Sequence, residues 1–64
     1  MPSYESITLT VKAKTEKALL LTDGETTEWI PISLMRDVDP EYINKGDETE
    51  FDIKRWLLEK HGFV

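Results

Sequence analysis

Hydrophobic and polar residues alternate strictly along the first part of the chain. Apolar side chains occupy every second position of this run: Ile7, Leu9, Val11 and Ala13. A period of two places one set of side chains on each face of a β-strand, so the run predicts a strand over residues 6–14. A second alternating run, with Thr49, Phe51 and Ile53 between acidic residues, predicts another strand over residues 48–53.

Two further apolar runs lie on either side of an Asp-Gly pair. Residues 18–22 are apolar on both faces, which is typical of a central strand. Residues 26–30 are expected to form the next strand, and Pro31 limits it because proline donates nothing to a ladder. Asp23-Gly24 indicates a hairpin, since both residues tolerate the positive φ that a type I′ turn needs. The pattern predicts a meandering antiparallel sheet.

Short helical turns are expected between the third strand and residues 48–53. Ser33 can cap a turn over residues 34–36 through its hydroxyl. Asp39 is a second N-cap candidate, because Pro40 follows it at the first helical position. In that second turn, Tyr42 and Ile43 are expected to face the core.

The last segment changes its period from 2 to 3.6, which predicts a helix over residues 54–61 with Asp52 as a cap. Its apolar residues have the spacing of one helical face: Ile53, Trp56 and Leu57. Gly62 is expected in the left-handed conformation, with Leu58 and Phe63 in contact as in a Schellman ending. A helix this short is unstable alone, so it must dock on the sheet.

The length of the chain limits the size of its core. A domain of 64 residues buries only about 60% of its unfolded surface. There is no cysteine to add a disulfide, so we expect Trp29 and Trp56 to supply bulk to the core. Residues 1–64 are therefore predicted to form one mainly β domain. Its expected form is a small four- to five-stranded antiparallel barrel, OB-like or SH3-like, closed by the C-terminal helix.

Acidic residues outnumber basic ones, 13 to 8, and give a net charge of −5. Such a balance opposes nonspecific binding to nucleic acid. The acidic residues are concentrated in one segment: Asp37, Asp39, Glu41, Asp47, Glu48, Glu50 and Asp52. These seven side chains form a candidate acidic face for a protein partner. The alternative is that they only solvate exposed strands and loops.

Catalytic and metal-binding residue patterns are weak in this sequence. The one histidine, His61, lies in the last predicted helical turn, where its charge complements the helix dipole. No serine lies in a nucleophile elbow. Asp37, Asp39 and Glu41 have the spacing of a calcium loop, but Tyr42 occupies the position that requires glycine. We therefore expect a protein that is not an enzyme and that has no metal and no cofactor.

Three motifs in the stretch from Val11 to Ile53 resemble the RNA-binding OB barrel repeat first recognised in a ribosomal protein. They are V-x-x-x-T-E-K-A-L-L-L-T-D-G, W-I-P-I-S and N-K-G-D-E-T-E-F-D-I. The chain departs from that family in lacking its fifth barrel strand, and Leu19 and Leu21 stand where the repeat carries surface aromatic and basic residues. The Trp-Ile-Pro-x-Ser run is also similar to that of short phage- and plasmid-type proteins, which implies an accessory protein of a mobile element.

These patterns leave two functions open. The first is a small protein-interaction module, acting as an accessory or inhibitor protein through the acidic face or a strand edge. The second is binding of single-stranded nucleic acid, with Trp29 or Tyr4 stacking on bases and with Lys12, Lys14 and Lys17 lining a groove. The net charge favours the first. With no signal-peptide pattern and no apolar run longer than residues 18–21, we expect a cytoplasmic protein without membrane contact.

Overall fold

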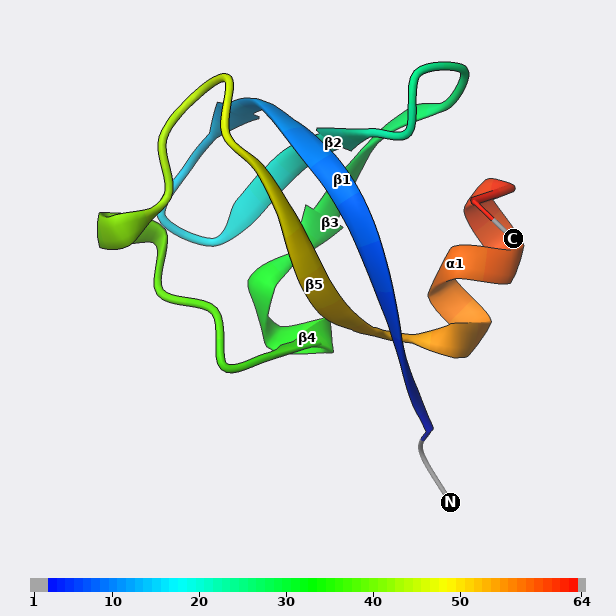
Figure 1. The fold of residues 1–64 in the computed structure, drawn as a ribbon. Helices are drawn as coiled ribbons and strands as arrows, with labels where there is room; N and C mark the ends of the chain where they lie inside the picture. The colour runs from blue at the N-terminus through cyan, green and yellow to red at the C-terminus, as the bar shows by residue number, and fades with distance from the viewer. Residues whose placement is uncertain (1–2, 64) are drawn as a thin grey trace.

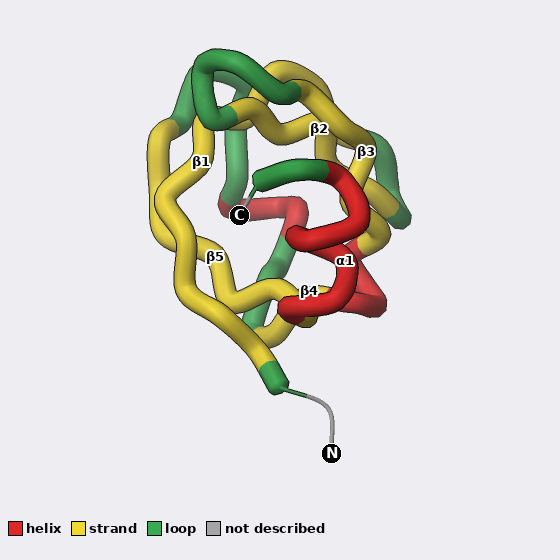
Figure 2. The backbone as a smooth tube through the Cα atoms, turned by 90° about the vertical axis from the view of Figure 1, so that its right-hand side faces the viewer, coloured by secondary structure: helices red, strands yellow, loops and turns green. Residues whose placement is uncertain are grey.

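A computed structural model describes residues 3–63, which form a curved sheet with one helix across its open end (Figures 1 and 2). The strands are β1 (Tyr4–Lys14), β2 (Ala18–Thr22), β3 (Thr27–Pro31), β4 (Met35–Arg36) and β5 (Glu48–Lys54). Two short 3₁₀ turns, η1 (Ile32–Leu34) and η2 (Pro40–Tyr42), and the helix α1 (Arg55–His61) complete the fold. The mainly β class and the C-terminal helix are confirmed.

The five strands form one antiparallel sheet in the order β3-β2-β1-β5-β4. β1 is long enough to pair with β2 through its second half and with β5 through its first half. A bulge between Val11 and Ala13 bends it where the two ladders meet. The edge strands β3 and β4 are linked by η1 alone, yet no ladder joins them in the part of the chain described. The sheet is therefore curled but open, and a closed barrel is not confirmed.

The concave face of the sheet and one side of α1 enclose a single hydrophobic core. Its members are Leu9, Val11, Leu19, Leu21, Ile30, Met35, Phe51, Ile53, Leu57, Leu58 and Phe63. Figure 2 shows α1 lying across the mouth of the curved sheet. Apolar positions of the alternating strands thus face inward as the sequence predicts, and the helix closes the open end.

Both tryptophans are exposed, contrary to the prediction that they belong to the core. Trp29 is 47% exposed and Trp56 is 50% exposed. Trp29 lies opposite Leu20, on the convex face of the β2–β3 hairpin. In α1 the neighbouring residues Leu57 and Leu58 take the buried side of the helix, so Trp56 is left outside. The aliphatic residues of a strongly curved small sheet therefore fill the core without the two indoles.

α1 follows β5 without a break, which explains how its ends differ from the prediction. Asp52 remains inside β5 and caps nothing, and Lys54 is the N-cap without a side-chain hydrogen bond. At the other end Gly62 has φ 82, and the Phe63 N–H donates to the Leu58 carbonyl at 2.9 Å. The predicted Schellman-type ending is confirmed.

Of the two turns between β3 and β5, only the second has a side-chain cap. Ser33 does not cap its turn: η1 begins after Pro31 with no side-chain hydrogen bond, and β4 follows it directly. Asp39 does cap η2, because its side chain accepts from the Glu41 N–H at 3.0 Å. Tyr42 points away from the core, however, and is 79% exposed.

The β2–β3 hairpin has a tight loop, but not a type I′ turn on Asp23-Gly24. Asp23 and Thr26 are joined by a backbone hydrogen bond, so Gly24 and Glu25 form the tip of the loop. Only Gly24, with φ 103, has a positive φ there, whereas type I′ needs two such residues. Hydrogen bonds from the Thr26 and Glu25 N–H groups hold the pKa of the Asp23 carboxyl below its ordinary value.

Replacement of Gly24 by valine is expected to destabilise the domain by about 1 kcal/mol or more. A Cβ atom at this position would meet no atom within 4 Å, so the cost comes from the positive φ and not from a clash. Thermal unfolding followed by circular dichroism measures the effect. Glu25→Val is the matched control, because Glu25 lies beside Gly24 without a positive φ. Equal melting temperatures for the two variants would contradict the prediction.

Candidate functional site

One edge of β5 is open, and the hydrogen-bond pattern of the sheet shows which of its residues are free. The Val11 N–H donates to the Asp47 carbonyl, and the Arg55 N–H donates to the Ser3 carbonyl, at the two ends of the β1–β5 ladder. Because antiparallel pairs alternate between bonded and non-bonded positions, the odd-numbered residues of β5 bond to β1. The N–H and C=O groups of Glu48 and Glu50 therefore point away from β1.

β4 covers only the far end of this edge. Its two residues pair with Ile53 and Asp52, and Arg36 lies opposite Asp52. The next residue, Asp37, has φ 56 and turns the chain away from β5. Among the described residues, no backbone hydrogen bond joins Glu48 or Glu50 to the departing segment. The result is a short stretch of unpaired strand in line with β4.

A groove of about 410 Å³ lies between this open edge and the segment that follows β4. The side of the groove toward the core is apolar, with Val38, Ile43 and Phe51 among the residues that line it. Exposed Tyr42 lies at its rim. Thr49 shares the inner face of β5 with buried Phe51 but is itself exposed, and it lines the groove.

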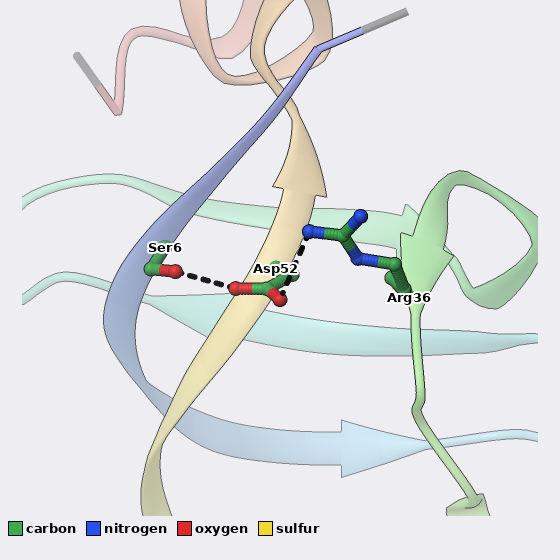
Figure 3. Close-up of polar contacts among 3 residues, drawn as sticks. All are labelled: Ser6, Arg36 and Asp52. Carbon is green, nitrogen blue, oxygen red and sulfur yellow. Dashed lines mark hydrogen bonds and ion pairs between the residues drawn. The ribbon is translucent and has the colours of Figure 1, made fainter.

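Four of the seven acidic residues that the sequence singles out line the groove: Asp37, Asp39, Glu50 and Asp52. Of these, Asp52 is already engaged. It accepts from the Ser6 hydroxyl, and its other oxygen lies 3.5 Å from Arg36 Nη2 (Figure 3). Arg36 also lies over the Tyr4 ring, 4.5 Å from its centroid. Glu50 has no ion-pair partner within residues 3–63.

The other three acidic residues lie outside the groove. Glu48 shares the convex face of β5 with Glu50 and lies opposite Thr10. Glu41 is in η2, beside the end of β1. Asp47 accepts from the Asn44 N–H at 2.9 Å, and so it holds the turn before β5. The structure thus brings part of the predicted acidic face together and gives Asp39, Asp47 and Asp52 structural hydrogen bonds.

The residues proposed for nucleic acid lie on three parts of the fold: β1, the β1–β2 connection and β3. Lys14 Nζ donates to the carbonyls of Pro40 and Ile43 at 2.8 and 2.6 Å, so it ties the end of β1 to η2. Lys12 lies at the bulge of β1, and Lys17 lies in the β1–β2 connection. Exposed Trp29 is on the convex face of β3.

The structure also places the histidine and the carboxylates that were considered for metal binding. Within residues 3–63, no three His, Asp or Glu side chains gather in a way that would hold a metal ion. His61 Nδ1 lies 3.7 Å from a carboxylate oxygen of Glu28, which gives an ion pair only when the imidazole is protonated. In the described part of the chain no helix has the length and apolar character to cross a membrane.

The open edge is the feature that residue patterns miss. A two-residue strand such as β4 carries no periodicity, and the positive φ of Asp37 has no clear signal in the sequence. Long-range pairing, not local composition, decides which main-chain groups of Glu48 and Glu50 are free.

Comparison of the chain with family models, with curated proteins and with solved structures finds no match. The resemblance to the OB barrel repeat and to phage- and plasmid-type proteins therefore stays a prediction.

Proposed function

We propose that this chain is a non-enzymatic protein-interaction module that binds its partner through the acidic groove beside β5. One observation carries the proposal: an unpaired strand edge lies next to a groove that four carboxylates and an apolar floor line. Unpaired strand edges are sites at which another chain adds by main-chain hydrogen bonds. We assign this role to an accessory or inhibitor protein, as the resemblance of the Trp-Ile-Pro-x-Ser run to phage- and plasmid-type proteins implies.

Capture of partners by the immobilised chain, read by mass spectrometry, tests this proposal. A double variant, E48K/E50K, reverses the charge of the two β5 carboxylates that lack an ion-pair partner within residues 3–63. The control, K12E/K17E, reverses two charges that are not part of the lining of the groove. The proposal expects a protein that the wild type and K12E/K17E retain and that E48K/E50K loses. With the purified partner, the loss is expected mainly in the association rate, since exposed charges steer encounter. Equal retention by all three chains would contradict the proposal.

Single-stranded nucleic acid is the second candidate ligand, and the exposure of Trp29 favours it. An exposed indole on a strand can stack on bases. The net charge of −5 and the engagement of Lys14 oppose it. We expect random oligonucleotides to bind no more tightly than about 0.1 mM at physiological salt. Fluorescence anisotropy measures this, and salt-sensitive micromolar binding that Trp29→Ala abolishes would reverse the ranking.

A further inference from the structure

The partner segment can be described from the geometry of the open edge. We infer that the edge of β5 at Glu48 and Glu50 receives an extended peptide segment, antiparallel to β5, in which basic residues flank an apolar one. This inference rests on the function proposed above and specifies its ligand. The segment would lie in line with β4, beyond the point where Asp37 turns the chain away from β5.

Main-chain pairing fixes the register of such a segment. Glu48 and Glu50 both direct N–H and C=O groups away from β1, so each can exchange two hydrogen bonds with the residue directly opposite. The residue between those two partners lies opposite Thr49 and turns its own N–H away from β5. Three peptide residues therefore suffice to satisfy the free groups of the edge.

Side-chain direction then gives the chemistry of each peptide position. Residues directly opposite in an antiparallel pair share one face, so the partners of Glu48 and Glu50 lie beside two carboxylates. Opposite charge is favourable there, which selects lysine or arginine. The middle residue points to the inner face, toward the apolar side of the groove at Val38, Ile43 and Phe51. The resulting motif is basic, apolar, basic.

The other edge of the sheet suits a peptide less well. Directly after β3 the Ile32 N–H donates to the Lys17 carbonyl, so the even-numbered positions of β3 bond to β2, and the main-chain groups of Thr27 and Trp29 face outward. The next outward position is Pro31, which has no N–H to donate. The groove beside β5 has no residue of β3 in its lining. The open edge of β5 is therefore the better receptor.

The probe is a capped peptide with the core Lys-Val-Lys, added to ¹⁵N-labelled full-length protein. Amide hydrogen exchange is expected to slow at Glu48 and Glu50 as the peptide saturates, and a Glu-Val-Glu peptide is expected to have no such effect. E48K/E50K should weaken binding of the basic peptide by about tenfold or more, because two attractions become repulsions.

A pair of modified peptides tests the main-chain contacts without changing the protein. Methylation of the lysine N–H groups removes the donors that face β5, and it should abolish protection of Glu48 and Glu50. Methylation of the valine N–H alone, which faces away, should preserve it. On the protein side, Glu50→Pro removes the free N–H while leaving the β1 ladder intact, and Glu50→Ala keeps that N–H. We expect the proline variant to bind more weakly than the alanine variant, with folding checked by circular dichroism.

Three outcomes would overturn the inference: protection at Thr27 and Trp29 instead of Glu48 and Glu50, equal binding of the two methylated peptides, or no saturable binding of the basic peptide. If Glu50→Pro fails to fold, the methylated peptides still decide the matter. If any of these outcomes is found but E48K/E50K still fails to retain a partner protein, the proposed protein-interaction function is supported. Only the inference that the partner binds as a peptide strand along β5 is then wrong.

Discussion

A chain that ends at Ile53 is expected to show no cooperative thermal transition. The deletion removes residues 54–64, which include α1 and the Gly62-Phe63 ending. Three buried side chains are lost with them: Leu57, Leu58 and Phe63. Loss of one buried leucine side chain typically costs about 2–5 kcal/mol. A whole domain is stable by only about 5–15 kcal/mol, and a domain of this size falls low in that range. Without α1, the apolar concave face of the sheet would also be exposed to water.

Circular dichroism during heating, with tryptophan fluorescence as a second probe, measures the result. Trp29 remains in the shortened chain and reports on the β2–β3 hairpin. Full-length Glu59→Ala, which changes an exposed residue of α1, is the control and should keep a sharp transition. A truncated chain that still melts cooperatively would show that the sheet is stable without its helix.

Local patterns predict most of the strands because each strand has one buried face. β2 occupies residues 18–22 as expected, and β1 and β5 extend the predicted strands by one or two residues. The end of α1 is predictable for a similar reason, since Gly62 and Phe63 form a local motif. In these cases the physical cause lies within a few residues of the feature.

The positions of the large aromatic side chains could not be predicted in this way. Burial of Trp29 or Trp56 depends on the curvature of the whole sheet, which decides how much room the core offers. Trp56 has the spacing of a core residue relative to Ile53, but α1 begins only at Arg55 and its start sets a different buried face. Leu57 and Leu58 then occupy that face.

The candidate site was predictable only in its charge. The clustering of seven acidic residues in the sequence predicts a single acidic face. The fold instead distributes these residues over β5, the turn before it, η2 and the segment after β4. Whether two carboxylates meet across a groove depends on where Asp37 turns the chain, and whether the Glu50 main chain is free depends on the alternation of the β1–β5 ladder. Both are consequences of pairing between residues far apart in sequence.

Leu58→Ala is expected to lower the free energy of unfolding by about 2–5 kcal/mol, and Trp56→Ala by less than about 1 kcal/mol. Leu58 has no exposed surface, so its truncation leaves a cavity against the sheet, whereas half of Trp56 is already in water. Both residues lie in the same helix and become alanine, and the helix propensities of ordinary residues differ by no more than about 0.7 kcal/mol, which is too little to account for the expected difference. Urea unfolding of the two variants measures the contrast. The free energies are comparable when the two variants have equal slopes of unfolding free energy against urea concentration. A larger loss for Trp56→Ala would place the indole in the core after all and would contradict the docking of α1 through Leu57 and Leu58.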